Sequence, residues 1–566
     1  MIKRFYAPLL LVVVVMLTAS CSTKMGALSP ELFTTTPQVL EAVGGQVPVT
    51  INGNFPAKYF PKKAIVEVTP RLAWNGGEAK GQPATFQGEK VEDNYQSIAY
   101  ATGGRFTMKT SYEYVPAMAK SELYLDFKAR VGNKEIAIPS VKIADGVIAT
   151  SELVNQTLAT ANPELGADAF QRIIKEAQQA NIMFLIQQAN IRAGELKNLK
   201  DFNAQVKEVA EAPNKKISNI EISAYASPDG GVGLNTKLAE NRESNTDKAL
   251  TNELKRAKMT EVMVDSKYTA QDWEGFKELV SKSNIQDKDV ILRVLSMYQD
   301  PERREAEIKN LSSVYKTLAE EILPQLRRSR LTLNYEIIGK SDEEISRLAA
   351  SNPSELNVEE LLYAATLTND DARKASIYTQ ATRQFPNDFR AFNNLGLLAY
   401  QQGDKAGAEN RFEQAARIAP NAPEVNMNLG LIALAKGNEN QAKTYLGKAS
   451  GTENLNETMG NLYILEGQYD RAVNSFGDAK TNSAALAQIL AKDYNKARTT
   501  LDNVTAKDAY TDYLKAILGA RTNNAQAVIS NLRAAVQKDA SLAKTAADDI
   551  EFAKFATNSD FQNIVR

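Results

Sequence analysis

The residues best suited to chemistry lie in one stretch, Ala224–Arg242, which reads A-Y-A-S-P-D-G-G-V-G-L-N-T-K-L-A-E-N-R. The 566-residue chain around it contains no histidine and one cysteine, which excludes Ser-His-Asp, Cys-His and histidine–metal sites. Catalysis by carboxylates alone needs a distinguishable acidic pair, and none of the 68 Asp and Glu residues stands out in a glycine-lined cleft. We therefore expect a binding protein without a metal or other cofactor, not an enzyme.

The overall composition is that of a globular, multidomain chain. Hydrophobic residues make up 43% and charged residues 24%, and the length suits about three or four domains. The net charge is -1 and no basic stripe is present. Because binding to nucleic acid depends on a strongly basic face, we expect no nucleic-acid partner.

The first twenty residues are typical of an export signal. Lys3 and Arg4 precede the apolar run Leu9–Leu17, and small residues follow up to Cys21. The apolar run is shorter than the roughly 20 residues needed to span a bilayer. We therefore expect residues 1–20 to be removed as a signal peptide.

The segment Leu17–Cys21 resembles the lipobox of bacterial lipoproteins, with Thr18 where the commonest form has leucine. This resemblance implies that the Cys21 thiol is acylated and that lipid chains anchor the mature N-terminus. Residues 22–25 lack the acidic run that marks surface-exported lipoproteins of the Bacteroidota. The expected location is thus the periplasmic side of the outer membrane. The alternative is that Cys21 is an incidental thiol of a discarded peptide.

Residues 21–154 are expected to form a β-sandwich. From Leu28 onward apolar residues recur at every second position, and glycine pairs at 44–45, 76–77 and 103–104 interrupt the runs. This pattern predicts short antiparallel strands in two packed sheets. The domain is either a partner-binding module or a spacer, because a sandwich supplies no chemistry by itself.

Residues 155–340 are expected to form an α/β domain, because strand and helix patterns alternate in the order β-α-β-α-β. The predicted elements are a strand at Asn181–Ile186, a helix at Glu195–Val209, a strand around Ile220 and Ile222, a helix at Leu238–Met259 and a strand at Arg330–Ile337. A charged helical insertion is predicted between Tyr268 and Leu326, without an assigned purpose.

The stretch Ala224–Arg242 in this order resembles the OmpA-like peptidoglycan-binding domain, whose signature is T-D-x-x-G-x-x-x-x-N-x-x-L-S-x-x-R-A. Gly230, Asn235, Leu238 and Arg242 fall at matching positions, and Ala239 replaces the serine. Residues 327–330, R-R-S-R, are similar to the family's closing N-R-R-V-E segment.

The resemblance implies that an aspartate and the arginine at position 242 grip the diaminopimelate of a peptidoglycan stem. One carboxylate and one guanidinium suit a zwitterionic amino-acid end. Ser227 occupies the place of the family aspartate, and Asp229 follows in the same turn. Asp229 either substitutes for it or the grip is lost. The alternative is a plain tight turn at residues 228–230 with Arg242 on a helix surface.

Residues 341–566 are expected to form a tetratricopeptide solenoid of about five to six repeats. The triplet Asn394–Gly396 recurs 34 residues later as Asn428–Gly430, and Pro386 and Pro420 have the same spacing. Small residues at these positions allow the two helices of a repeat to approach closely. Residues 548–561 are typical of a terminal cap.

Such a stack forms a concave groove that binds protein partners. Asn393, Asn394 and Asn428 lie near predicted helix starts and are candidates for groove contacts, although solvated surface positions are an equal alternative.

Together the regions resemble a Bacteroidota OmpA-like and tetratricopeptide outer-membrane lipoprotein. The expected function is to tether the membrane to peptidoglycan and to scaffold protein partners. The alternative is an accessory factor for assembly of a secretion or fimbrial machine whose OmpA-like domain has lost its ligand. A carboxylate-based wall hydrolase ranks last.

Overall fold

The computed structural model describes residues 25–285, 287–310 and 312–566. The predicted signal peptide and Cys21 lie outside the described residues. The chain divides into two compact units. The first comprises the residues up to Ala167 together with Tyr378–Arg566, and the second comprises Asp168–Ile377. The second unit is therefore a continuous insertion into the sequence of the first.

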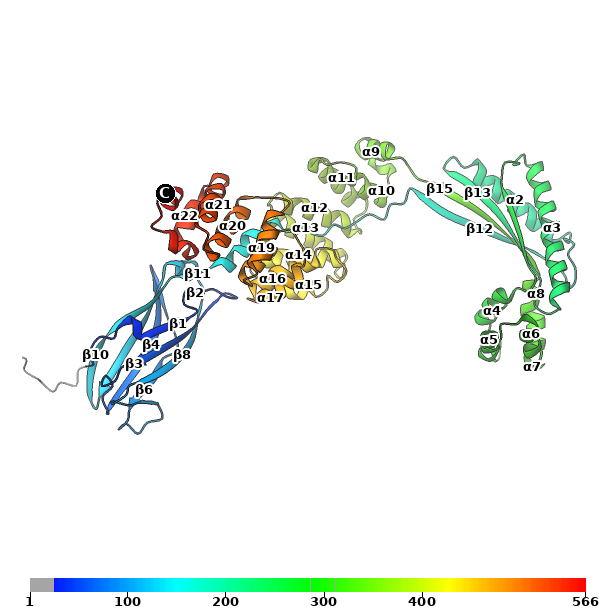
Figure 1. Cartoon of the computed structure of the whole chain (residues 1–566). Coiled ribbons are helices and arrows are strands. Elements are labelled where there is room, and N and C mark those ends of the chain that lie inside the picture. Colours follow the sequence, from blue (N-terminus) through cyan, green and yellow to red (C-terminus); the bar gives the residue numbers. More distant parts are fainter. Residues whose placement is uncertain (1–24, 286, 311) are drawn as a thin grey trace, which may run out of the picture. The chain divides into compact units, whose positions relative to one another are not determined.

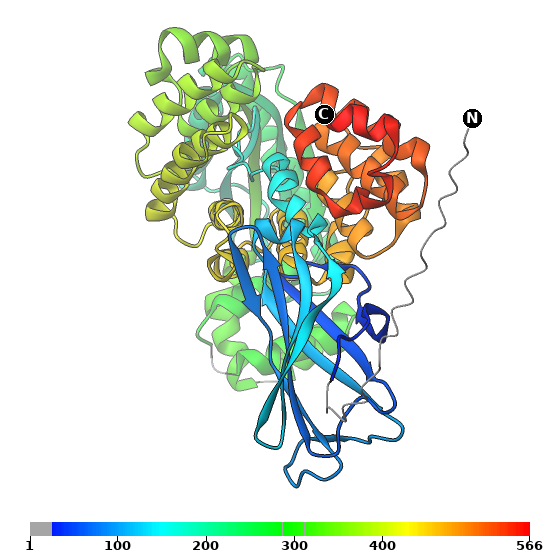
Figure 2. The same cartoon turned by 90° about the vertical axis from the view of Figure 1, so that its left-hand side faces the viewer.

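The N-terminal part of the first unit, called the β-domain, is built from strands in two facing sheets (Figures 1 and 2). One sheet has the order β1-β3-β8, and the other has the order β10-β9-β4-β6-β7 with β5 paired to β4. The strands are β1 (Phe33–Thr36), β3 (Gln46–Phe55), β4 (Ala64–Trp74), β5 (Gly77–Lys80), β6 (Ala84–Gly88), β7 (Gln96–Ile98), β8 (Gly104–Glu113), β9 (Glu122–Val131) and β10 (Lys134–Asp145). A short parallel pair joins β2 (Leu40–Glu41) to β11 (Val147–Ile148).

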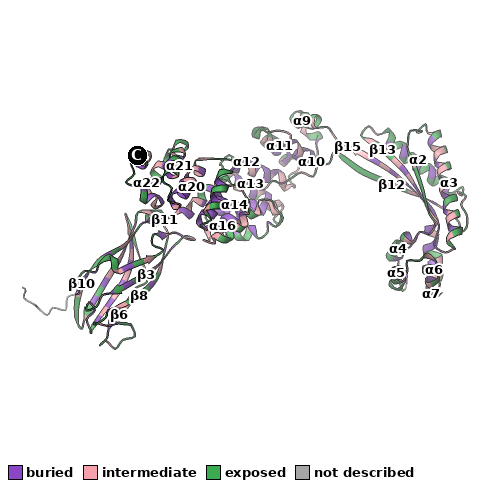
Figure 3. Cartoon of the chain, in the orientation of Figure 1, coloured by how far each residue is buried: buried purple, intermediate pink, exposed green. Residues whose placement is uncertain are grey.

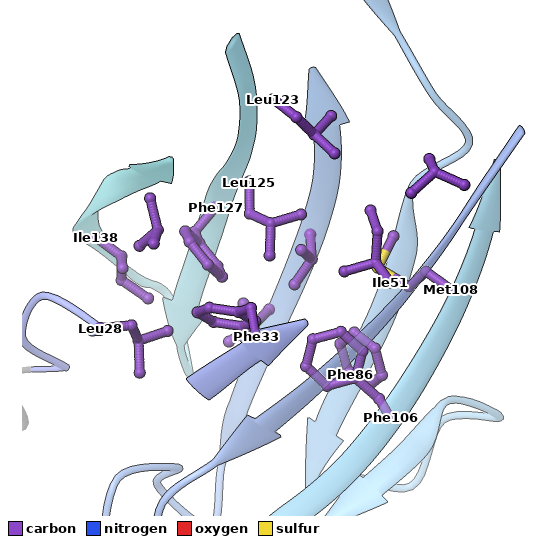
Figure 4. Close-up of a cluster of buried hydrophobic side chains, with 14 of the residues drawn as sticks. Leu28, Phe33, Ile51, Phe86, Phe106, Met108, Leu123, Leu125, Phe127 and Ile138 are labelled. Carbon is purple, nitrogen blue, oxygen red and sulfur yellow. The ribbon is translucent and has the colours of Figure 1, made fainter. Parts of the chain in front are cut away.

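Alternate residues of these strands fill one core between the sheets (Figure 4). In β3 buried and more exposed residues alternate, as the period-two pattern predicts. Phe86 of one sheet and Phe106 of the other lie with their ring centroids 4.6 Å apart. The prediction of a strand-rich N-terminal region is confirmed.

The C-terminal part of the first unit is an all-helical solenoid of antiparallel pairs. The helices are α12 (Phe389–Gln401), α13 (Lys405–Ile418), α14 (Pro423–Ala435), α15 (Glu439–Leu446), α16 (Leu455–Leu465), α17 (Tyr469–Phe476), α18 (Asn482–Leu490), α19 (Tyr494–Asp502), α20 (Ala509–Arg521) and α21 (Ala525–Lys538). The cap consists of α22 (Ser541–Asp548), a 3₁₀ segment (Ile550–Phe555) and α23 (Ser559–Val565). Helix α14 is buried along most of its length (Figure 3).

The repeated glycine has a packing reason. A Cβ at Gly396 would lie 2.6 Å from Cε1 of Phe412 on the paired helix, and a Cβ at Gly460 would lie 2.6 Å from Cε2 of Phe476. Atoms cannot approach that closely, so each ring occupies the space that the missing side chain leaves. Glycine and an aromatic ring therefore form a matched pair in these two repeats, and in the repeat between them Leu446 takes the place of the ring against Gly430.

The β-domain joins the solenoid through a buried ionic cluster. Arg521 at the end of α20 contacts Glu41 of β2 at 2.9 Å and also pairs with Glu551 of the cap. Burial alone would lower the pKa of Arg521, but the two carboxylates outweigh it and raise that pKa. This cluster ties both ends of the first unit together.

The second unit contains a four-stranded sheet with the order β12-β15-β13-β14. Its elements are β12 (Ile173–Met183), α2 (Glu195–Glu211), β13 (Lys215–Tyr225), α3 (Val232–Arg256), β14 (Val264–Thr269) and β15 (Arg328–Ile338). Strands β13 and β14 are parallel, and the other pairs are antiparallel. The observed order agrees with the predicted β-α-β-α-β alternation, with two differences at the sheet edges.

Both differences occur where strands are exposed. Strand β12 runs from Ile173 to Met183, whereas the predicted strand was Asn181–Ile186. The sequence pattern missed the first half of β12 because that half is solvent-exposed and has no apolar alternation. Strand β14 was not expected, since nearly all of its residues are exposed. An edge strand that faces solvent carries little hydrophobic signal.

The predicted helical insertion is present between β14 and β15. It contains α4 (Trp273–Lys282), α5 (Lys288–Met297), α6 (Pro301–Asn310), α7 (Ser312–Thr317), a π-helical turn (Leu318–Ile322) and α8 (Leu323–Leu326), with a hydrophobic core of its own. After β15, helices α9 (Asp342–Ser351) and α10 (Val358–Thr366) begin the helical region, and α11 (Asp371–Gln384) leads into the first unit.

Candidate functional site

The groove of the solenoid contains a segment of the chain itself, residues 158–167, which we call the strap. Asn428 of α14 binds both main-chain groups of Glu164: the Glu164 N–H donates to Asn428 Oδ1 at 2.6 Å, and Asn428 Nδ2 donates to the Glu164 carbonyl at 2.8 Å. Asn393 of α12 donates to the same carbonyl at 2.9 Å. These side chains therefore satisfy the main-chain N–H and carbonyl of Glu164, as the main chain of a neighbouring β-strand would.

Asn394 repeats this arrangement two residues further along the strap. The Gly166 N–H donates to Asn394 Oδ1 at 2.8 Å, and Asn394 Nδ2 donates to the Gly166 carbonyl at 2.9 Å. A Cβ at Gly166 would lie 3.0 Å from Cβ and 3.1 Å from Cα of Arg390. The close approach of the strap to α12 therefore favours glycine at position 166.

The Glu164 carboxylate of the strap also binds the solenoid. It accepts hydrogen bonds from the N–H groups of Glu453 and Asn454, at 3.1 and 3.2 Å, and from Asn454 Nδ2 at 2.9 Å. These donors lie at the start of α16, where unpaired amide groups and the helix dipole favour a negative charge. The groove thus selects an acid at position 164.

The opposite end of the strap is held by apolar contact. Leu158 is 1% exposed and packs among side chains of α12 to α16. The Tyr400 hydroxyl donates to the Leu158 carbonyl at 3.1 Å, and burial raises the Tyr400 pKa to about 12, so this donor stays protonated. Just before the strap, Ser483 of α18 donates to Thr157 at 2.9 Å. The strap is therefore anchored at both ends.

The three predicted groove asparagines are thus brought together, at 0–1% exposure, so the alternative that they are solvated surface positions is wrong. Their occupant was not foreseen. Residues 155–167, assigned from sequence to the α/β domain, lie in the first unit against the solenoid.

Arg242 of α3 is fully buried in the second unit. Its guanidinium donates to the carbonyls of Gln188, Tyr225 and Leu185 at 2.9, 2.8 and 3.2 Å. Phe184 lies against it, with 5.1 Å from Cζ to the ring centroid. Burial, followed by the nearby charge of Arg327, lowers the Arg242 pKa to about 10. Each guanidinium nitrogen thus donates to a carbonyl of the fold, which argues against the expected grip on a ligand carboxylate. The alternative of a surface helix residue is wrong, because the side chain is buried.

The other predicted site residues form a closed turn beside it. Asn235 Nδ2 donates to the carbonyls of Ser227 and Gly230 at 3.0 and 2.9 Å. Asp229 accepts a hydrogen bond from the Ser227 hydroxyl and forms an ion pair with Arg327 at 3.2 Å. The carboxylate therefore faces Arg327, a residue that the sequence analysis placed only in the closing segment.

The helical insertion lies over this turn. The hollow between them encloses about 10 Å³, room for about one water molecule. It is lined by Pro228, Asp229, Trp273, Phe276, Glu305, Ile308, Tyr315, Leu318 and Leu323. A diaminopimelate side chain does not fit there without movement of the insertion.

Within residues 25–285, 287–310 and 312–566, no group of three or more Asp, Glu, His or Cys side chains is placed to hold a metal ion. No helix of that same part of the chain has the length and apolar character to cross a membrane.

The tetratricopeptide repeat family model matches residues 369–423 and 395–445. A tetratricopeptide repeat protein from Parabacteroides merdae has 13% identity and a TM-score of 0.29, over 40% of this chain and 89% of that chain. PilW, described as a type IV pilus biogenesis factor, has 16% identity and a TM-score of 0.26, over 40% and 98%. The Cut9–Hcn1 structure has 14% identity and a TM-score of 0.31, over 66% and 82%. No curated protein matches the chain.

The repeat match and the helical pairs define the C-terminal region as a tetratricopeptide-type protein-interaction scaffold.

Proposed function

We propose that this chain is a lipid-anchored scaffold on the periplasmic side of the outer membrane. It would serve as an accessory factor in assembling a secretion or fimbrial machine, without enzymatic activity. Its α/β domain is OmpA-like in fold and does not bind peptidoglycan. The alternating strands and helices of the second unit and the loop residues 230, 235, 238 and 242 support the fold assignment. The N-terminal signal and Cys21 support the lipid anchor.

The burial of Arg242 carries the choice of an assembly factor over a wall tether. A tether needs a guanidinium that can release its partners and accept a ligand carboxylate. Arg242 is itself fully buried and donates to three main-chain carbonyls, so freeing it would break three hydrogen bonds of the fold. Asp229 is likewise paired with Arg327. The geometry therefore favours a structural role for both charges.

Sedimentation with purified peptidoglycan tests this choice. The full-length chain is expected to stay in the supernatant. Asp229→Asn serves as the site variant, and Asp265→Asn, an exposed position on β14, is the matched control. Retention of the wild-type chain that disappears in Asp229→Asn and persists in Asp265→Asn overturns the proposal. The same samples are expected to release no soluble glycan fragments.

Two measurements in cells test the remaining parts. Labelled fatty acid is expected to enter the wild-type protein and not Cys21→Ser, and equal labelling of both contradicts the lipid anchor. Crosslinking in intact cells is expected to capture components of an envelope machine. Recovery of peptidoglycan fragments without a protein partner contradicts the scaffold.

A further inference from the structure

The strap occupies the solenoid groove as a bound peptide would, and its contacts define what the groove recognises. Five hydrogen bonds join the side chains of Asn393, Asn394 and Asn428 to main-chain atoms of Glu164 and Gly166: the asparagines donate three and accept two. Main-chain contacts require an extended backbone and no particular sequence. Any extended segment that fits between α12 and α14 can make them.

Side-chain selectivity falls on three positions of the strap, 163, 164 and 166. Glu164 binds the start of α16, Gly166 allows the close approach to Arg390, and Pro163 is buried. Leu165, by contrast, is 41% exposed. The groove therefore fits an extended peptide with a carboxylate followed two residues later by glycine, and it tolerates any side chain between them.

We propose that the strap is an exchangeable occupant and that a partner's extended acidic peptide of this kind replaces it. This inference rests on the proposed scaffold function and specifies the partner's chemistry. The strap is held by side-chain hydrogen bonds and by Leu158, and Leu165 is 41% exposed, so the strap can leave without breaking a main-chain hydrogen bond within the helices. Because the strap is tethered, its effective concentration is on the order of millimolar, so a partner competes when it is held nearby in an assembly.

Peptide binding to the full-length chain tests the exchange. The probe is a fluorescein-labelled peptide with the sequence of residues 156–170, and the control peptide carries phenylalanine in place of Gly166. In the protein, Gly166→Phe weakens the strap and leaves the groove intact. Because apparent affinity scales with the fraction of open groove, this variant is expected to bind the probe at least about tenfold more tightly than wild type. Adding Asn394→Ala and Asn428→Ala is expected to abolish binding.

The inference is overturned if folded Gly166→Phe protein, verified by circular dichroism, binds the probe no more tightly than wild type. Glu164→Ala, which removes the carboxylate contacts alone, replaces it if Gly166→Phe fails to fold. Hydrogen exchange gives a second measure: the amides of residues 164 and 166 are expected to exchange faster than those of α14. Exchange at the same rate as α14 means that the strap is a permanent part of the solenoid. The peptide-binding and hydrogen-exchange experiments use neither peptidoglycan nor cells. A negative result in them is therefore distinguishable from a negative result in the tests of the proposed function.

Discussion

Asn428 and Glu164 bind one another through two hydrogen bonds, although 264 residues of sequence separate them. The whole second unit lies within that interval. The chain thus leaves the solenoid at the strap and returns to it at Tyr378, and Asn428 fixes the point of departure.

Replacing Asn428 with alanine should destabilise the first unit by about 1–3 kcal/mol, because the Glu164 N–H loses its partner in a partly buried site. The two tryptophans, Trp74 and Trp273, lie one in each unit. Urea unfolding followed by Trp74 fluorescence in a Trp273→Phe background isolates the first unit. Asn440→Ala, an exposed position on α15, is the control, and equal loss in both variants contradicts the assignment.

Replacing Arg242 with alanine should cost the second unit about 3 kcal/mol, since three hydrogen bonds to main-chain carbonyls and the cation over the Phe184 ring are lost. Trp273 fluorescence in a Trp74→Phe background measures the loss. Arg256→Ala on the same helix, whose side chain is 74% exposed, should change stability by less than about 0.5 kcal/mol. An unchanged midpoint in Arg242→Ala means that the guanidinium is not structural.

Removing Arg521 should destabilise the first unit by about 3–5 kcal/mol, because the Glu551 carboxylate, 4% exposed, is left without its cation. In a double-mutant cycle, Arg521→Ala combined with Glu551→Gln should cost less than the sum of the two single changes. Strict additivity of the unfolding free energies contradicts a coupled pair.

Asp549 predicts a pH dependence of stability. Burial raises its pKa to about 6, although the Glu551 N–H and the Tyr513 hydroxyl donate to its carboxylate. Between about pH 4 and 6 the folded chain holds a proton that the unfolded chain has released, so this group's contribution to stability falls as pH rises through that window. The loss is on the order of 3 kcal/mol.

Urea unfolding of the first unit from pH 4 to 7 tests this dependence. Asp549→Asn should remove part of the slope, and Asp560→Asn, an exposed position on α23, should retain it. A slope that is identical in wild type and Asp549→Asn rules Asp549 out as its source.

The sequence predicted the elements whose residues face a core. The β3 alternation and the matched Gly396–Phe412 pair leave periodic signals because packing imposes them. The edge strands β12 and β14 left little signal, since their residues face solvent. The helix repeat was therefore more visible than the sheet boundaries.

The sequence predicted the position of the candidate site more accurately than the roles of its residues. Arg242 and Asn235 do lie beside the predicted turn, but spacing along a helix cannot show whether a guanidinium faces solvent or main-chain carbonyls. The strap was invisible because asparagine–main-chain contacts across hundreds of residues have no local period.

The separation between the strap and its asparagines also governs the order of folding. During synthesis, residues 158–167 emerge long before Asn428, so they lack that partner while the inserted α/β unit is completed. The strap can dock only after the later helices of the solenoid have been synthesised. A chain truncated before α14 would therefore carry a folded insertion on an unanchored stem.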